Sequence, residues 1–365
     1  MEEDQSNSSL CFQFDERDVE TITKVKMGLG GVGVLTSILA IAIIAASKRF
    51  RRKFVYRLVG YLMFTALLES LAYILEEVPL DYSSNHIALR NETIFKLLCV
   101  GAGVYAQFAA WLENIVVCWI VVYLLLLAVC SYAPGSGQRG ESCTAWEVCG
   151  VGISVIVAVS VCWIPLVRNM YGFAGAWCWI KLTEGDCHSG YTLGLIYQFT
   201  LYYGPQQVVI VFSLATFLLI VVVLCKQTVQ GVRGCCQPSS YRTGLCEAFP
   251  LVLYAVVYDL MCILVAVNKI YYAIQIPHGV KPDYQLWLAI AVDDPLRALL
   301  PPVVFILHWI IKIIRMKLAK VKERTTTYAV ISNEDEDVGG DKEHIVIQSE
   351  HHNVYQYSVF EGVVD

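Results

Sequence analysis

Charged residues are scarce in this chain of 365 residues, where they make up 16% of the total, whereas hydrophobic residues make up 56%. A soluble globular domain carries about 25% charged residues. The composition therefore excludes an ordinary soluble protein and indicates a membrane protein. The segment Met1–Lys26 also lacks the apolar core of a signal peptide, so we expect the first apolar run to act as the targeting and anchoring segment.

Several residues that membrane enzymes and pigments need are missing. A retinal protein needs a lysine within its last helix, and there is none between Tyr284 and Ile311. A membrane zinc hydrolase needs a cluster of histidines, whereas only His308 falls within an apolar run. The chain has no phosphate-binding Gly-Lys-Ser/Thr motif. We therefore expect no enzymatic activity, no metal or other cofactor, and no nucleic-acid partner.

Long apolar runs, by contrast, are abundant. A helix that crosses the hydrocarbon core of a bilayer, about 30 Å thick, needs roughly 20 mainly apolar residues. Seven segments meet this requirement: Met27–Ser47, Phe54–Leu75, Leu97–Ser131, Val148–Val167, Tyr191–Leu224, Ala248–Asn268 and Tyr284–Ile314. We expect an all-α membrane protein, built as a seven-transmembrane helix bundle. The chain lacks the internal repeat that is typical of transporters made of two related halves.

Basic residues set the expected orientation of the bundle. Five of them follow the first span directly, between positions 48 and 53. Positive residues favour the cytoplasmic side, which places the amino terminus outside and, after seven spans, the carboxyl terminus inside. We expect a short extracellular amino terminus over residues 1–26, a seven-helix transmembrane domain over residues 27–314, and a cytoplasmic tail over residues 315–365.

The tail divides into two parts. Its first part, "IIKIIRMKLAKVKER", alternates apolar and basic residues. This pattern predicts either an amphipathic helix on the inner membrane surface, in contact with anionic membrane lipid, or a continuation of the seventh span into the cytosol. The acidic stretch Asn333–His344 is too polar to form a core, so we expect it to be disordered. Serine and threonine residues of the tail are candidate phosphoacceptors, which would allow phosphorylation-dependent partners to bind.

Two sets of residues are expected on the outer side. Asn7 and Asn91 lie in N-glycosylation sequons. Oxidation is also possible on that side, and the topology places four of the 14 cysteines there: Cys11, Cys99, Cys178 and Cys187. Four cysteines allow three pairings, and the topology must decide among them.

The stretch "YGFAGAWCWIK" holds Cys178 between Trp177 and Trp179, in the loop before the fifth span. Cys99 lies at the outer end of the third span, so a bond from Cys99 to Cys178 would tie this loop over the mouth of the bundle. Such a bond typically contributes about 2–4 kcal/mol; the alternative is an unpaired interfacial thiol. The two tryptophan rings are expected at the bilayer interface, where amphipathic rings settle. The other two outer cysteines, at positions 11 and 187, form a second candidate pair.

These features resemble one family. Seven spans with an external amino terminus, Cys99 at the top of the third span and a "WCWI" loop before the fifth resemble G-protein-coupled receptors, and "GAWCWI" is similar to the class E cyclic-AMP receptors and the secretin-like receptors of class B. The resemblance covers residues 26 to 315. It implies a plasma-membrane receptor that binds an extracellular ligand within the bundle and activates a heterotrimeric G protein. The third span ends in "LLLLAVCSYAP", without the Asp-Arg-Tyr triplet of rhodopsin-like receptors, so that class is excluded.

Polar residues inside the predicted spans are candidates for function, because hydrocarbon disfavours them. The candidate switch in the last two spans comprises Asp259, Asp293, Asp294, Pro295 and Arg297. Asp293 and Asp294 precede Arg297 by four and three residues, spacings at which helical side chains meet, so we expect an ion pair in a helix kinked by Pro295. A static structural pair is the alternative to a switch.

A candidate ligand pocket comprises Glu113, Asn114, Tyr202, Tyr203, Gln206 and Trp179. The break at Gly204-Pro205 in the fifth span frees backbone groups and brings glutamines into the bundle. Glu113 and Asn114 could instead make interhelical hydrogen bonds. Glu69 in the second span is a further intramembrane candidate. Because buried charges also mark ion paths, a multi-pass transporter or channel that relays ions or protons is the alternative function.

Overall fold

A computed structural model describes residues 16–84, 92–130, 140–174, 177–181, 191–231, 251–263, 265–267, 270–271 and 284–334. Several predictions lie outside the described residues: the sequons at Asn7 and Asn91, the pair Cys11 and Cys187, and the acidic part of the tail beyond residue 334. Within the described residues, the chain is helical apart from one short hairpin and the residues that join these elements.

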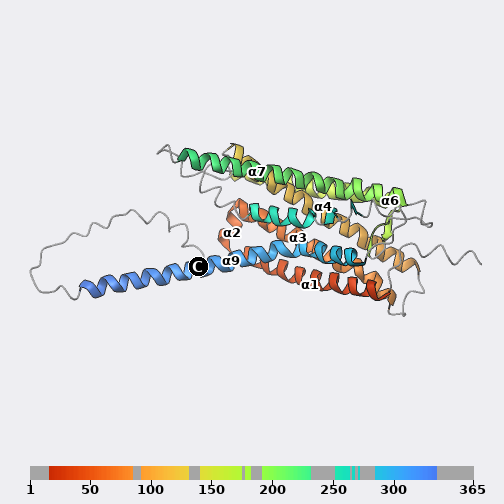
Figure 1. Cartoon of the computed structure of the whole chain (residues 1–365), viewed down its shortest axis with the longest axis horizontal. Helices are drawn as coiled ribbons and strands as arrows, with labels where there is room; N and C mark the ends of the chain where they lie inside the picture. The colour runs from red at the N-terminus through yellow and green to blue at the C-terminus, as the bar shows by residue number, and fades with distance from the viewer. Residues whose placement is uncertain are drawn as a thin grey trace, which may run out of the picture.

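Long helices packed side by side make up the body of the molecule (Figure 1). In chain order the elements are α1 (Glu16–Ala46), α2 (Lys48–Arg52), α3 (Phe54–Ser84), α4 (Glu92–Cys130), α5 (Gly140–Val167), β1 (Tyr171–Phe173), β2 (Cys178–Ile180), α6 (Tyr191–Gln198), the π-helix η1 (Phe199–Tyr203), α7 (Gly204–Gly231) and α9 (Tyr284–Glu334). An apolar helix, Leu251–Val267, lies between α7 and α9 in the chain.

Among the described residues, six helices are long and apolar enough to cross a membrane: Arg17–Ala46, Phe54–Val78, Thr93–Leu126, Trp146–Val167, Leu193–Val223 and Tyr284–Ala319. Each of them overlaps one of the predicted spans. The predicted span Ala248–Asn268 corresponds to the shorter apolar helix Leu251–Val267. The chain is therefore an all-α, multi-pass membrane protein.

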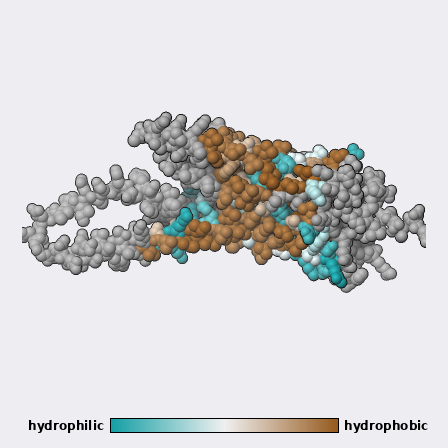
Figure 2. Space-filling model, in the orientation of Figure 1, coloured by the Kyte–Doolittle hydropathy of each residue, from teal (hydrophilic) through white to brown (hydrophobic). Residues whose placement is uncertain are grey.

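The surface of the bundle is apolar along the length of these helices (Figure 2). Large aliphatic side chains point outward on several helices, among them Leu35 of α1, Val148 of α5 and Val208 of α7, each exposed by two thirds or more. Lipid tails solvate such side chains, whereas water does not. The same helices bury polar residues such as Ser37 and Gln107. Apolar side chains on the outside and polar side chains inside are the reverse of the pattern in a soluble protein, and they suit a protein surrounded by lipid.

Small residues let neighbouring helices approach closely. In α1, Gly33 faces Ser70 of α3, and a Cβ built on Gly33 would lie 2.5 Å from the Ser70 hydroxyl oxygen. In α5, Gly150 faces Trp119 of α4 so closely that a Cβ would overlap the indole ring. Helices in lipid associate through packing of this kind, because the hydrophobic effect does not drive them together there.

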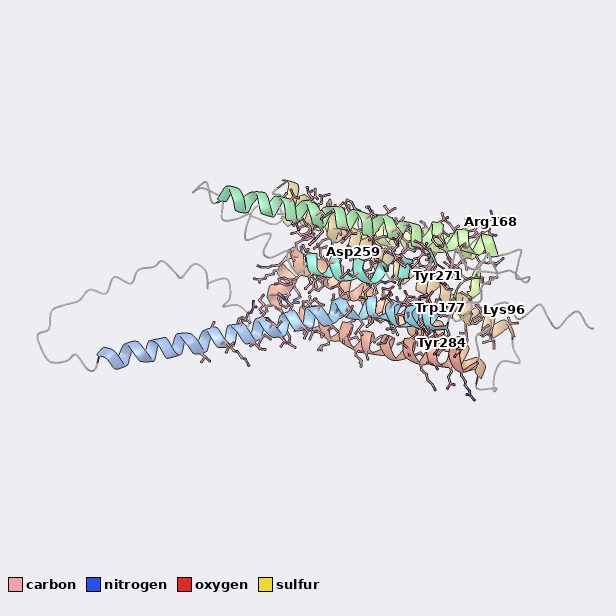
Figure 3. The ribbon with its side chains drawn as sticks, in the orientation of Figure 1. Lys96, Arg168, Trp177, Asp259, Tyr271 and Tyr284 are labelled. Carbon is pink, nitrogen blue, oxygen red and sulfur yellow. A yellow bond between two sulfur atoms is a disulfide. The ribbon has the colours of Figure 1, made fainter. Side chains whose placement is uncertain are left out.

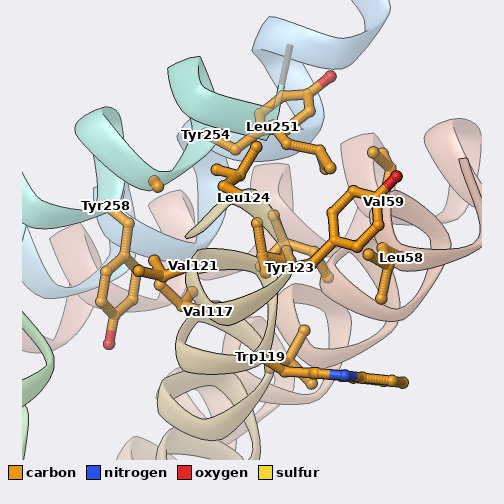
Figure 4. Packing of buried hydrophobic residues seen from close by; sticks show 14 of the residues in the cluster. Leu58, Val59, Val117, Trp119, Val121, Tyr123, Leu124, Leu251, Tyr254 and Tyr258 are labelled. Atoms are coloured by element: carbon orange, nitrogen blue, oxygen red, sulfur yellow. The ribbon is translucent and has the colours of Figure 1, made fainter. Parts of the chain in front are cut away.

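The largest apolar cluster lies at the end of the bundle that contains α2, called the α2 end below. Leu58 and Val59 of α3, Leu124 of α4, and Leu251 and Tyr254 of the helix that follows α7 belong to this cluster and are buried (Figure 4). Side chains of α1, α2, α7 and α9 complete it. Apolar packing therefore joins most of the helices at this end.

One ion pair lies at the α2 end. Arg57 of α3 pairs with Glu147 of α5. The guanidinium of Arg57 also donates to the main-chain oxygens of Arg51 and Arg52, at 3.3 Å each. These two carbonyls lie in the last turn of α2, where main-chain oxygens have no hydrogen-bond donor within the helix. The side chain of Arg57 supplies that donor.

The opposite end, called the hairpin end below, contains β1 and β2. The strands are antiparallel, with Tyr171 opposite Ile180. Asn169 precedes them with φ of 52°, a left-handed conformation that asparagine adopts more readily than most residues. The Tyr171 hydroxyl donates to the main-chain oxygen of Cys162 of α5 at 3.2 Å. Burial raises the pKa of Tyr171 above its ordinary value, so this hydroxyl stays a neutral donor.

The last helix is unusually long. α9 continues from Tyr284 to Glu334 through Pro295, Pro301 and Pro302. Neighbouring helices can satisfy the carbonyls that a proline leaves open in a membrane helix. The basic stretch that follows the seventh predicted span is part of α9, which is the second of the two alternatives offered by the sequence, and α9 projects beyond the α2 end (Figure 1).

Candidate functional site

A disulfide fastens the hairpin to the bundle. It joins Cys99, near the start of α4, to Cys178, the first residue of β2, across 79 positions of the chain. This is the bond that the predicted topology favours. β2 lies so close to α4 that a Cβ built on Gly103 would be 3.2 Å from the Cα of Trp179. A covalent bond and a glycine contact therefore hold the hairpin against α4.

The two tryptophans beside Cys178 are buried inside the protein. The Trp179 indole N–H donates to the side-chain oxygen of Gln107 at 2.8 Å. Trp177 packs against Trp287 of α9 with 4.7 Å between ring centroids. The prediction that both rings lie at the bilayer interface is wrong, because the hairpin folds inward over α4 and α9 and removes them from lipid. Trp177 lies at the same end of the bundle as the start of α9 at Tyr284 (Figure 3).

Arg297 of α9 is the centre of a buried group of polar side chains. Its guanidinium pairs with Glu69 of α3, and it donates to the hydroxyls of Tyr202 at 2.8 Å and Tyr73 at 3.1 Å. The Tyr73 hydroxyl donates to Glu69 at 2.8 Å. The Nε of Arg297 lies 3.5 Å from a carboxylate oxygen of Glu113 of α4. These five residues, called the Arg297 cluster below, connect α3, α4, η1 and α9.

The predicted switch residues are only partly brought together. The sequence suggests a partner for Arg297 within α9, whereas Glu69 and Glu113 reach it from other helices. Asp293 is buried and one of its carboxylate oxygens has no hydrogen-bond partner. Asp294 lines the cavity that lies beside Arg297. The interhelical pairing of Arg297 is thus a feature that helical spacing alone does not predict.

A second charged group contains residues that the sequence did not single out. Lys26 of α1 is 1% exposed, and its ammonium lies 2.7 Å from Glu76 and 3.3 Å from Glu77 of α3. The Thr23 hydroxyl donates to Glu77 at 2.8 Å. The Lys26 ammonium also lies 4.2 Å from the centroid of the Trp177 ring. These five residues are called the Lys26 cluster below.

The Lys26 cluster was missed because of where the first helix begins. The predicted span starts at Met27, but α1 begins at Glu16 and carries Lys26 into the bundle. A usable signal was present: two consecutive carboxylates, Glu76 and Glu77, end the second apolar run, and a single lysine begins the first. Charges that border two adjacent antiparallel spans can neutralise each other at one end of the bundle.

A cavity of about 40 Å³ is lined by members of both clusters. Such a space holds a few water molecules, since one water needs about 10–15 Å³. Three predicted pocket residues, Tyr202, Tyr203 and Trp179, line it. The other three predicted pocket residues, Glu113, Asn114 and Gln206, do not. The three aromatic residues of the predicted pocket therefore line the cavity, whereas its acidic residue and its two amide residues do not.

Those amide residues instead bond to the helix that follows α7. The Tyr258 hydroxyl donates to the side-chain oxygen of Asn114 at 2.5 Å. The Gln206 amide donates to the sulfur of Cys262 at 3.0 Å. The predicted switch residue Asp259 is buried on the same helix. The alternative that Asn114 makes an interhelical hydrogen bond is the one the structure contains.

A π-helix places two tyrosines in the site. The N–H of Gly204 bonds to the carbonyl of Phe199, five residues earlier, so η1 contains one residue more than an α-helical turn. A Cβ on Gly204 would lie 2.7 Å from that carbonyl oxygen, which explains glycine at this position. Tyr202 and Tyr203, the last residues of η1, are both buried and both line the cavity.

Pro205 completes this break in the helix. It has no N–H to donate to the preceding turn. The carbonyl of Leu201, four residues earlier, accepts from two side chains of α4 instead, the Trp111 indole at 2.7 Å and the Gln107 amide at 3.2 Å. At the Gly204-Pro205 break predicted from the sequence, side chains of α4 therefore bond to the main chain of η1.

Comparison with known protein families finds no matching family, and no curated protein matches the chain. In the described part of the chain, no group of three or more histidine, cysteine, aspartate or glutamate side chains is placed to hold a metal ion. The inference of function therefore depends on the geometry of the hairpin end.

Proposed function

We propose that the chain is a cell-surface receptor with seven transmembrane helices, which binds an extracellular ligand at the hairpin end and activates a heterotrimeric G protein. One observation carries this proposal. A hairpin held by the bond between Cys99 and Cys178 contributes Trp179 to the wall of a small cavity, and charged side chains that line or border that cavity connect α1, α3, α4 and α9. A ligand that enters this cavity could contact groups on several helices at once and so change how those helices pack.

The orientation follows from two physical arguments. A stable disulfide needs an oxidising compartment, so the hairpin end faces the outside of the cell. The basic residues between positions 48 and 53 belong to α2 and its flanks, at the opposite end, where positive charge favours the cytoplasm. With Leu251–Val267 as the sixth of seven spans, the amino terminus is outside and the carboxyl terminus inside. The plasma membrane is the compartment this arrangement fits.

Activation would pass through the Arg297 cluster. A ligand shifts a conformational equilibrium only if it binds one arrangement better than the other. Glu69 and Tyr202 both line the cavity and both contact Arg297, so a ligand group that bonds to either one competes with the guanidinium. Loss of those bonds frees α9 to move against α3 and η1. A G protein bound at the α2 end would respond to that movement of α9.

A transporter or channel is the second candidate function. The observation that favours it is the number of buried carboxylates near the hairpin end, which exceeds the number of buried cations there. Carboxylates of this kind line cation and proton paths in membrane proteins. This candidate predicts flux of sodium or protons into sealed vesicles that contain the purified chain, and the receptor candidate predicts none.

The deciding experiment is nucleotide exchange on a panel of purified G proteins, with the full chain in lipid vesicles. We expect basal exchange above that of empty vesicles, and we expect Cys178→Ala to change it, since the hairpin then loses its attachment to α4. Cys149→Ala is the matched control, because the Cys149 thiol is exposed and free. Flux without exchange on any G protein would contradict the receptor and support the transporter.

A further inference from the structure

Carboxylates outnumber cations around the cavity at the hairpin end. Among the residues that the structure describes, the carboxylates Glu69, Glu76 and Asp294 line it, together with one cation, Arg297. The Lys26 ammonium adjoins Glu76 but also pairs with Glu77, so it adds no net positive charge. The buried carboxylates of the two clusters, Glu69, Glu76, Glu77 and Glu113, also outnumber their buried cations, Lys26 and Arg297. Burial of carboxylates in excess of their counter-charge is strongly unfavourable. The site therefore needs further protons or a bound cation.

The remaining wall of the cavity is aromatic apart from three alanines, Ala72, Ala106 and Ala110. Tyr73, Trp177, Trp179, Tyr202 and Tyr203 line it. Ring faces attract cations, and most strongly where water is excluded. Trp179 stands edge-on to Tyr202 and Tyr203, with ring planes at 82° and 81°. Rings at such angles form the walls of a box rather than a flat stack.

Lys26 shows which cation these groups accept. Its ammonium lies 4.2 Å from the centroid of Trp177 and 5.6 Å from that of Tyr73, while Glu76 accepts from it at 2.7 Å. Both rings and this carboxylate also line the cavity. The wall of the cavity thus already holds one primary ammonium through a carboxylate and ring faces.

An acceptor for a second ammonium is present. Glu69 lines the cavity and is 1% exposed, and its Oε2 has no hydrogen-bond partner, while its Oε1 contacts Arg297. An unpaired carboxylate oxygen at this depth is costly unless a donor reaches it. An anionic ligand would add to the excess of negative charge, so the donor must be neutral or positive.

We infer that the cavity binds the ammonium group of an external ligand, with Glu69 and Glu76 as counter-charges and the ring faces of Trp177, Tyr202 and Tyr203 as walls. The volume of about 40 Å³ admits the ammonium and the first carbon attached to it. The rest of the ligand extends away from the cavity. This inference deepens the proposed receptor function by naming the ligand class, and its test measures binding without a G protein.

The experiment is thermal unfolding of the full chain in lipid nanodiscs, titrated with methylammonium chloride and, at equal ionic strength, with sodium chloride. A ligand that binds only the folded state raises Tm in a saturable way. We expect saturable stabilisation by methylammonium and none by sodium. Equal stabilisation by both salts would overturn the ammonium site in favour of an inorganic cation site. No stabilisation by either would overturn it in favour of protonated carboxylates.

Two variants make the test specific, with effects of opposite sign. Glu76→Gln should weaken methylammonium binding at least tenfold, whereas Glu147→Gln, which removes a carboxylate at the α2 end, should leave it unchanged. Lys26→Met should strengthen binding at least tenfold, because Glu76 and Glu77 lose their resident ammonium. If Glu76→Gln does not fold, Lys26→Met alone decides: unchanged or weaker binding overturns the inference.

Two sources could supply the ammonium, a small amine or the amino terminus of a peptide. Separate titrations with 2-phenylethylammonium and with a short peptide amide, free or acetylated at its amino terminus, distinguish them. Saturable stabilisation by either amine supports the site and identifies its source, and equal stabilisation by the acetylated peptide overturns it. Amine binding without nucleotide exchange would contradict the proposed receptor alone, while exchange without amine binding would contradict this inference alone.

Discussion

The two ends of the bundle are held together by different forces. At the α2 end, aliphatic and aromatic side chains from α1, α3, α4, α7 and α9 form one large buried cluster, with the ion pair of Arg57 and Glu147 beside it. At the hairpin end, buried charges dominate: the Arg297 cluster, the Lys26 cluster and a disulfide. The apolar cluster there is smaller and richer in aromatic side chains.

The difference has a consequence for motion. Dispersion contacts are individually weak and numerous, so apolar packing does not depend on exact pairs of atoms. Charge clusters depend on exact partners, so they favour a small number of distinct arrangements. In the proposed receptor, the hairpin end would detect a polar ligand and the α2 end would respond as a packed unit. The four predictions below test this contrast.

The largest effect is expected from Arg297→Gln. Removal of one partner from a buried ion pair leaves uncompensated charge and costs about 3–5 kcal/mol. The double variant Glu69→Gln with Arg297→Gln removes both charges and should cost clearly less than the single one. The measurement is the free energy of unfolding in detergent micelles titrated with denaturant. A single variant within about 1 kcal/mol of wild type would show that charge does not hold the hairpin end together.

Next in size is Cys178→Ala. Loss of the bond to Cys99 removes a covalent constraint and should lower the free energy of unfolding by about 2–4 kcal/mol. Cys149→Ala, at an exposed free thiol, should change it by less than about 0.5 kcal/mol. Reducing agent should lower the stability of the wild type by more than that of Cys178→Ala. If both alanine variants unfold alike, the hairpin is attached by packing alone.

At the junction of α4 and α5, packing should dominate. Gly150→Ala forces a methyl group into the indole ring of Trp119, and overpacking of this kind costs about 1–3 kcal/mol. Gly152→Ala is the matched control two residues away, since a Cβ there meets no atom within 4 Å. The same denaturant titration measures both. A loss as large for Gly152→Ala would mean that the effect comes from the helix itself and not from the α4 contact.

The smallest effect is expected from Trp111→Phe. It removes the indole bond to the Leu201 carbonyl and should cost about 1 kcal/mol. Pro205→Ala restores a backbone N–H, so in that background the cost of Trp111→Phe should fall, which a double-mutant cycle measures. Trp163→Phe is the control, because that side chain is 62% exposed. Additive costs would show that Leu201 gains nothing from the restored N–H.

Much of the fold could be predicted from local patterns. Apolar runs gave the position of each long helix, because hydrocarbon thickness fixes the length a span must have. The topology brought Cys99 and Cys178 to one end, which made their bond predictable. The Gly204-Pro205 pair marked a break, since neither residue supports an ordinary helical turn there.

The partners within the site could not be predicted in the same way. Helical spacing identifies neighbours on one helix, so it offered Asp293 and Asp294 to Arg297 but not Glu69. Which faces of two helices meet depends on packing across the whole bundle. Trp177 was misplaced for a related reason: a tryptophan suits a bilayer interface and a protein interior alike, and only the path of the hairpin decides between them.

The length of α9 sets a distance in the cell. Its 51 residues span roughly 76 Å at about 1.5 Å each, more than twice the thickness of the hydrocarbon core. In the proposed orientation its last turns stand well clear of the lipid headgroups. Deletion of seven residues, about two turns, would draw the tail inward by roughly 11 Å while keeping nearly the same face toward a partner. If a partner binds the tail, as the proposed function allows, the length of α9 sets the distance of that partner from the bilayer.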